Sequence, residues 1–155
     1  MANLIVILGP TASGKTRLAV RLARDLNSEI ISADSRQVYR GMDIGTGKDL
    51  EEYRIDGVEI PYHLINIVDP DYDFNVFEYQ ARFYRCYREI ASRGIVPVLV
   101  GGTGLYLSAV LEGYRMVEVP EDPELRESLK SETLEGLQRR LLAMNPSLHN
   151  TTDLL

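Results

Sequence analysis

The sequence has little cysteine and no long apolar run. Its single cysteine, Cys86, cannot form a disulfide within the chain, which favours a reducing compartment and predicts a cytoplasmic protein. No apolar stretch approaches the ~20 residues that a membrane span needs, so we expect no membrane association. The N-terminus also lacks the basic stretch and following apolar segment of a secretory signal.

Positive charge is also scarce. The chain has 17 Lys and Arg against 23 Asp and Glu, which gives a net charge of −6 at pH 7. Proteins that neutralise many phosphates usually carry a basic face, so composition by itself gives no support to nucleic-acid binding. Neither of the two histidines, His63 and His149, is assigned a catalytic role. Cys86 lies in a helical pattern of apolar residues, which favours a packed thiol over a nucleophile.

What the sequence does contain is a phosphate-binding pattern near its start. Residues 9–16 match G-x-x-x-x-G-K-[ST], the P-loop pattern. This pattern indicates a phosphate-binding loop only where it lies between a strand and a helix. The apolar run 3–8 predicts a buried strand before the pattern. The predicted packing face of the helix after it comprises Leu18, Ala19, Leu22, Ala23 and Leu26.

The residues of this loop suit the binding of phosphate. Its two glycines let successive N–H groups point at phosphate oxygens, and the helix N-terminus adds partial positive charge. Lys15 adds a full charge, and the Thr16 hydroxyl is placed to hold Mg²⁺. The predicted diphosphate site comprises Gly9, Pro10, Thr11, Ala12, Ser13, Gly14, Lys15 and Thr16.

Strand-like and helix-like segments alternate through the rest of the chain. Further strands are predicted at 28–32, 63–68 and 95–100, and residues 41–61 are expected to be mostly loop. Helices are predicted at 77–91, at 105–111 and over the charged region 124–144. The helix at 77–91 is expected to be capped at its N-terminus by Asn75 and Glu78 and to end at Gly94. The possible packing positions in 124–144 are Leu125, Leu129, Leu134, Leu137 and Leu141. This order predicts an α/β fold, a P-loop NTPase-like parallel sheet with helices on both faces and a helical C-terminal extension. We expect a core at 1–113 and the start of an incomplete C-terminal region at 114–155.

Polar residues follow the predicted strands at the edge where ligands bind in open α/β sheets. Asp34 is either a general base or a Mg²⁺-associated carboxylate, and the alternative is a turn aspartate. Asp69 is expected to be structural, because Asp-Pro-Asp is common in turns. Thr103 could contact phosphate or cap a helix. These residues predict a P-loop enzyme and leave open whether it is a small-molecule kinase or another phosphate-processing transferase.

Three blocks taken together are more specific than any one of them. Residues 9–16, 31–46 and 100–106 closely resemble the tRNA dimethylallyltransferase family, and 62–70 is similar to the region between the last two. The resemblance covers essentially the whole chain. It implies transfer of a dimethylallyl group from dimethylallyl diphosphate to N6 of an adenosine next to the anticodon of tRNA.

The resemblance also implies roles for individual residues. The P-loop would hold the diphosphate of the prenyl donor instead of ATP, with Mg²⁺, and Asp34 would accept the N6 proton. Thr103 would lie near the diphosphate and the target nucleotide. The residues implied to contact tRNA are Asp34, Ser35, Arg36, Gln37, Thr103 and Arg126. We expect a monomer whose partners are the tRNA anticodon loop and the prenyl donor.

Two departures from the family pattern bear on activity. Gly47-Lys48-Asp49 stands where many members have Ala-Lys-Pro. Family members also continue past the region that resembles 149–153, into an arginine-bearing segment and tRNA-gripping helices, so we expect this chain to be a fragment that binds diphosphate without turnover. The alternatives are a P-loop nucleoside or small-molecule kinase and an isopentenyltransferase that modifies free adenine nucleotides.

Overall fold

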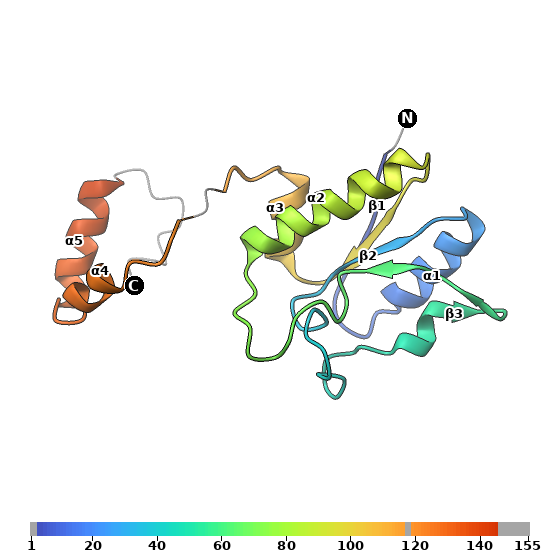
Figure 1. Ribbon diagram of the computed structural model, residues 1–155, viewed down its shortest axis with the longest axis horizontal. Coiled ribbons are helices and arrows are strands. Elements are labelled where there is room, and N and C mark those ends of the chain that lie inside the picture. Colours follow the sequence, from blue (N-terminus) through green and yellow to red (C-terminus); the bar gives the residue numbers. More distant parts are fainter. Residues whose placement is uncertain (1–2, 117–118, 146–155) are drawn as a thin grey trace. The chain divides into compact units, whose positions relative to one another are not determined.

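Four strands form one parallel sheet in the order β1-β6-β2-β5 (Figure 1). They are β1 (Ile5–Leu8), β2 (Ile30–Ala33), β5 (Tyr62–His63) and β6 (Val98–Gly101). The structure, a computed structural model, describes residues 3–116 and 119–145. The chain divides into two compact units, Met1–Val117 and Glu118–Leu155. The sheet belongs to the first unit.

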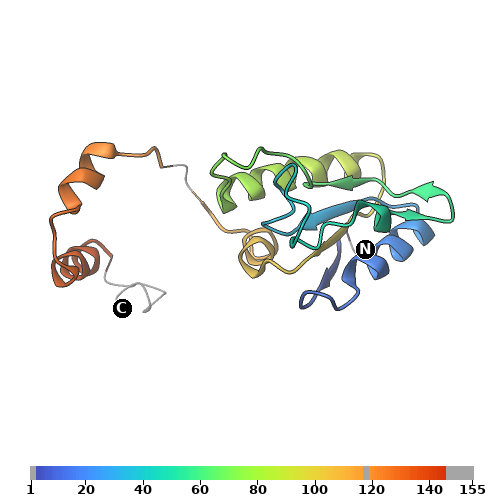
Figure 2. The same ribbon diagram turned by 90° about the horizontal axis from the view of Figure 1, so that it is seen from below.

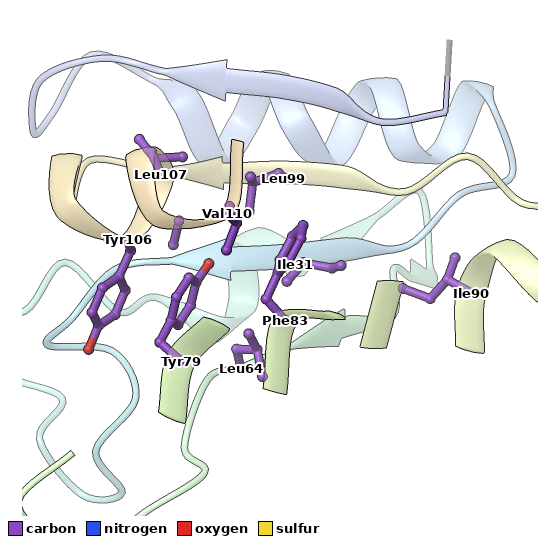
Figure 3. Close-up of a cluster of buried hydrophobic side chains, with 10 residues drawn as sticks. Ile31, Leu64, Tyr79, Phe83, Ile90, Leu99, Tyr106, Leu107 and Val110 are labelled. Atoms are coloured by element: carbon purple, nitrogen blue, oxygen red, sulfur yellow. The ribbon is translucent and has the colours of Figure 1, made fainter. Parts of the chain in front are cut away.

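Helices cover both faces of this sheet (Figure 2). Successive strand residues point to opposite faces. Ile30 and Val98 therefore pack in the cluster that includes α1 (Lys15–Asp25). Ile31 and Leu99 pack on the other side with α2 (Val76–Ser92) and α3 (Gly104–Leu111), as Figure 3 shows. The predicted fold class, a parallel sheet between helices, is confirmed.

Helix α1 turns a narrower face to the sheet than the sequence predicts. Ala19 and Ala23 are fully buried as expected, and Val20 joins them. Leu18 and Leu26 are 57% and 50% exposed, so the predicted packing face is wrong at both ends. The apolar stripe is centred on the small residues, which lets the helix backbone lie close to the sheet while the leucines flank the contact.

Helix α2 has the predicted ends. The Asn75 side chain accepts a hydrogen bond from the Glu78 N–H at 3.0 Å and donates one to the Glu78 carboxylate at 3.2 Å. Gly94 follows the helix with a φ of 78°, the left-handed conformation that ends many helices. Cys86 is half-buried, and burial raises the pKa of its thiol, as befits a packed residue rather than a nucleophile.

The strand predicted at 63–68 is wrong after its first residue. Leu64 and Asn66 have φ values of 64° and 55°, so the backbone leaves the extended conformation directly after β5. The Asn66 N–H donates to the Gln37 carbonyl at 3.0 Å, and Val68 forms an isolated parallel bridge with Tyr39. An apolar run can therefore pack as an irregular segment when its backbone finds partners elsewhere.

The segment 41–61, predicted to be mostly loop, contains regular structure in its second half. A 3₁₀ helix, η1 (Leu50–Tyr53), leads into a hairpin of β3 (Arg54–Ile55) and β4 (Val58–Glu59). Asp56 and Gly57 form its turn with φ values of 52° and 78°. An Asp-Gly pair between short strands favours this turn, so the sequence carried the signal.

The second unit contains α4 (Pro123–Leu129) and α5 (Leu134–Met144). The helical extension predicted over 124–144 is thus present as two helices with separate N-terminal caps, Asp122 and Thr133. No residue of α4 or α5 is buried in the part of the chain that the structure describes, so the predicted packing leucines find no core here. His149 lies outside the described residues.

Candidate functional site

The loops after β1, β2 and β6 meet at one edge of the sheet and line a cleft of about 1020 Å³. Because all three strands run parallel, their carboxyl ends share this edge. The predicted site residues that line the cleft are Gly9, Pro10, Thr11, Ala12, Gly14, Lys15, Thr16, Asp34, Ser35, Arg36, Gln37 and Thr103. Ser13 is not among the lining residues, and Arg126 belongs to α4 of the second unit.

The P-loop winds tightly between β1 and α1. Ala12 and Gly14 both have left-handed backbone, with φ values of 62° and 82°. Ser13 turns its hydroxyl back to the Pro10 carbonyl at 2.8 Å, which explains why it does not face the cleft. The Lys15 ammonium donates to the same carbonyl at 2.5 Å. Helix α1 begins at Lys15, so its first N–H groups have no partner within the helix, and N–H groups in this position favour an anion.

Glycines let the loop after β6 approach the P-loop. A Cβ on Gly101 would lie 2.2 Å from the Ala33 carbonyl oxygen, so no other residue fits between β6 and β2 at this point. A Cβ on Gly102 would lie 3.3 Å from the Gly9 carbonyl oxygen and 4.0 Å from the Lys15 ammonium. The loop after β6 therefore lies against the P-loop.

Asp34 organises the turn that follows β2. Its Oδ1 accepts hydrogen bonds from the N–H groups of Arg36 at 2.9 Å and Gln37 at 3.3 Å. The alternative role, that of a turn aspartate, is thus filled by one carboxylate oxygen. Oδ2 has no hydrogen bond to any residue that the structure describes, and Asp34 lines the cleft. One oxygen holds the turn and the other is available for chemistry.

Thr103 joins two loops instead of capping its own helix. Its hydroxyl accepts a hydrogen bond from the Ser35 N–H at 2.9 Å and lies 3.3 Å from the Ser35 hydroxyl. Although Thr103 precedes α3, its side chain makes no cap hydrogen bond to that helix. The alternative of a simple helix cap is therefore wrong for the hydroxyl, and Thr103 ties the turn of Asp34 to the loop after β6.

The remaining wall of the cleft was missed by sequence reasoning. It consists of Asp43, Gly45, Thr46, Gly47, Lys48, Asp49, Leu50, Glu52 and Tyr53. These residues fall in the segment predicted to be mostly loop, and their glycines gave no reason to place them near the P-loop. Gln37 connects the two regions, because its side-chain amide donates to the Gly47 carbonyl at 3.2 Å.

Lys48 holds the residues of this wall in place through its buried side chain. Its side chain is only 1% exposed, and its ammonium binds the Tyr39 carbonyl at 2.8 Å, the Asn66 side chain at 2.6 Å and the Asp43 carboxylate at 2.8 Å. A buried ammonium is stable only when it is paired and hydrogen-bonded, and these three partners meet that need. The left-handed backbone at Asn66 belongs to the same network. No local sequence pattern predicts that Lys48 contacts residues as distant in the chain as Tyr39 and Asn66.

Thr16 lies in the first turn of α1 and borders the cleft, where the sequence places a Mg²⁺ contact. Within residues 3–116 and 119–145, no group of three or more His, Cys, Asp or Glu side chains is arranged to hold a metal ion. Mg²⁺ commonly keeps several waters and is held through one or two protein groups together with substrate phosphates. A Thr16 hydroxyl beside a phosphate-binding loop fits that mode.

The other polar residues singled out from the sequence have structural partners. The Asp69 carboxylate accepts a hydrogen bond from Arg40 at 3.0 Å, which supports its expected structural role. His63 lies 2.8 Å from Glu29, which also binds Arg93. His63 is not among the residues that line the cleft.

A parallel sheet covered on both faces, with a P-loop after its first strand, defines a P-loop-like α/β protein. Two family profiles match the chain: one described as IPP transferase over residues 37–154, and one described as Isopentenyl transferase over residues 2–62. The chain belongs to the IPP transferase family. The resemblance stated from the sequence is thereby confirmed.

Similar proteins agree with this membership. The chain is 82% identical over 155 residues to tRNA dimethylallyltransferase 1 of Syntrophus aciditrophicus, covering all of this chain and 51% of the relative. It is 65% identical over 153 residues to the protein of that name from Geotalea daltonii, covering 99% of this chain and 48% of the relative. The chain thus spans about half the length of the curated relatives it matches.

Solved structures show the same fold. The full-length tRNA isopentenylpyrophosphate transferase of Bacillus halodurans matches with a TM-score of 0.69 at 41% identity, over 99% of this chain and 53% of that one. A eukaryotic dimethylallyltransferase acting on tRNA matches with a TM-score of 0.78 at 31% identity, over 92% of this chain and 36% of that one. Across the described residues, no helix is both long and apolar enough to cross a membrane.

Proposed function

We propose that this chain is the donor-binding, N-terminal half of a tRNA dimethylallyltransferase. One observation carries the proposal: the P-loop, the turn of Asp34 and the loop of Thr103 line a single cleft. Membership of the IPP transferase family and the names of the relatives support it. A single cysteine and an RNA acceptor both suit the cytoplasm, and we expect the protein to act as a monomer.

The proposed reaction forms a bond between N6 of adenosine and C1 of the dimethylallyl group while the bond from C1 to the diphosphate oxygen breaks. The diphosphate leaves with its electron pair, and the N–H groups of the P-loop and the Lys15 ammonium stabilise the charge that develops on it. Mg²⁺ bound beside Thr16 would supply further positive charge to the leaving group. The Oδ2 of Asp34 accepts the N6 proton as the new bond forms.

The acceptor base has to reach the cleft out of the anticodon loop. Unpaired loop bases can leave their stack at a cost of a few kcal/mol, which makes such a site accessible to tRNA. We propose that Ser35, Arg36 and Gln37, on the turn that Asp34 organises, contact the base, and that Arg126 contacts the tRNA backbone. Thr103, which is hydrogen-bonded to Ser35, would hold the target base and the diphosphate in position relative to each other.

A titration of the 155-residue chain tests the donor half of the proposal. Dimethylallyl diphosphate, pyrophosphate and ATP are each added with Mg²⁺, and binding is measured by calorimetry. We expect the two diphosphates to bind and to compete with each other. Tight ATP binding, together with phosphoryl transfer to a small molecule and no prenyl-donor binding, would instead establish the kinase alternative.

A free adenine nucleotide is a second candidate acceptor, because the Isopentenyl transferase profile matches residues 2–62, which include the P-loop and Asp34. The two acceptors are compared in a chimera that joins residues 1–155 to the remaining half of the Syntrophus aciditrophicus relative. With AMP and an anticodon stem-loop present together, we expect the prenyl group on the stem-loop. Modification of AMP alone would favour the second candidate.

A further inference from the structure

Tyr53 stands out among the residues that line the cleft, because its ring is buried and its hydroxyl is not used by the protein. It ends η1, the 3₁₀ helix that Asp49 caps by accepting a hydrogen bond from the Glu51 N–H. Only 4% of the residue is exposed, and its ring packs in the same cluster as Val20 of α1. The ring centroid lies 4.6 Å from that of Tyr62. The side chain is therefore held in place by packing.

The Tyr53 hydroxyl reaches solvent at the cleft. It makes no hydrogen bond to any residue that the structure describes, whereas the hydroxyl of Tyr79, which is fully buried, donates to the Ser32 carbonyl at 3.0 Å. Among the described residues, no fully buried side-chain nitrogen or oxygen lacks a partner. The small exposed part of Tyr53 must therefore include the hydroxyl oxygen, and Tyr53 borders the cleft.

The cleft that Tyr53 borders is the one that the P-loop lines. Residues four apart on a helix share a face, so Thr16 lies one turn above Val20, toward the helix N-terminus. Thr16 also lines the cleft, and Tyr53 packs against the cluster of Val20. Burial, reinforced by the nearby charge of Glu52, raises the pKa of Tyr53, so the hydroxyl stays protonated and acts as a donor.

We propose that Tyr53 donates a hydrogen bond to an oxygen of the diphosphate that the P-loop holds, a role that rests on the function proposed above. A hydrocarbon group in front of this hydroxyl would remove it from water without offering a partner, which is unfavourable. A phosphate oxygen satisfies it. The Tyr53 hydroxyl is also uncharged, so it can contribute to diphosphate binding next to the carboxylates of Asp34 and Glu52 without forming an ion pair with either.

The test uses three variants of the 155-residue chain, titrated with pyrophosphate and Mg²⁺ by calorimetry. Y53F removes the hydroxyl and keeps the ring, and we expect it to bind about tenfold more weakly or worse, the loss typical of one hydrogen bond to a charged group. Y62F is the matched control, because Tyr62 packs on the same ring but is not among the lining residues, and its affinity should stay unchanged. K15A reports whether binding uses the P-loop.

The outcomes separate this inference from the proposed function. Unchanged affinity in Y53F, with loss in K15A, overturns the role of Tyr53 and leaves the function standing. Equal losses in Y53F and Y62F show a packing effect and also overturn it. Absence of binding by the parent chain overturns the proposed function and this inference together. The thermal midpoint of ligand-free Y53F should match that of the parent, and a clear fall would reveal an internal partner and contradict the proposal.

Discussion

The hydroxyl of Thr103 accepts a hydrogen bond from the backbone N–H of Ser35 at 2.9 Å, although the two residues are 68 positions apart in the chain. The Thr103 N–H in turn donates to the Ala33 carbonyl at 3.1 Å. These contacts join the loops after β2 and β6, which both line the cleft. The turn that carries Asp34 is therefore fixed relative to the loop that lies against the P-loop.

Replacement of Thr103 tests this connection. T103V keeps the shape of the side chain but leaves the Ser35 N–H without its partner, and we expect a loss of about 1 kcal/mol in the free energy of unfolding. T103S keeps the hydroxyl and should behave like the parent. Urea unfolding of the three proteins is the measurement. Equal stability of T103V and T103S would show that the hydrogen bond contributes nothing to holding the loops together.

Removal of Lys15 should abolish diphosphate binding. Its ammonium is the only full positive charge within the P-loop, and Lys15→Ala removes it without touching the N–H groups of the loop. Lys130→Ala, a change at an exposed lysine of the second unit, is the control for net charge. The affinity for dimethylallyl diphosphate is measured for both. A change of less than about threefold, under ~1 kcal/mol, in Lys15→Ala would refute the P-loop assignment.

Local patterns were enough to predict the frame of the site. The P-loop is flanked by the strand and helix that its pattern requires, and Asn75 with Glu78 caps α2 as expected. The three loops that follow parallel strands had to share an edge, so the meeting of Asp34, Thr103 and Lys15 in one cleft followed from topology.

The wall of the cleft could not be predicted in the same way. Lys48 is buried because Tyr39, Asn66 and Asp43 surround its ammonium, and their encounter depends on the tertiary fold. The apolar run after His63 does not continue as a strand, since the left-handed backbone at Asn66 serves this network. Hydrophobic periodicity records which side chains are apolar, and it carries no information about such long-range polar contacts.

Asp34→Asn should separate donor binding from chemistry. Asn keeps an oxygen that can accept the N–H groups of Arg36 and Gln37, so the turn should persist while the base is lost. In the chimera with the Syntrophus aciditrophicus half, we expect donor affinity within about threefold of the parent and turnover lower by ~10²–10⁴-fold. Asp69→Asn, at a carboxylate that pairs with Arg40, serves as the control. Near-normal turnover would reduce Asp34 to a turn residue, and loss of donor binding would favour a metal-associated role.

Acid should destabilise the first unit through Glu29. Burial by itself would raise the pKa of this carboxyl, but hydrogen bonds from Arg93 and His63 outweigh it and bring the pKa below the ordinary 4.5. A lowered folded-state pKa contributes stability above the unfolded pKa, and that stability is lost as the pH falls through the folded pKa. The free energy of unfolding of the parent should therefore decline below about pH 4.5.

Glu29→Gln removes this titration and is the variant that tests it. Its unfolding free energy, measured with urea between neutral pH and pH 3, should be lower at pH 7 than that of the parent and should depend less on acid. Glu59→Gln changes an exposed carboxyl of β4 and should follow the parent. The same acid dependence in Glu29→Gln and in the parent would assign the loss to other groups.

The most direct test of the account is the site of prenylation in an anticodon stem-loop. The chimera of residues 1–155 with the Syntrophus aciditrophicus half is incubated with dimethylallyl diphosphate and Mg²⁺, and the RNA is digested and analysed by mass spectrometry. We predict one dimethylallyl group on N6 of the adenosine next to the anticodon. With Asp34→Asn we predict prenylation slower by ~10²–10⁴-fold. With the 155-residue chain alone, whose net charge of −6 opposes RNA binding, we predict none. A folded chimera that binds the donor but leaves the stem-loop unmodified, while the intact relative modifies it, would contradict the account.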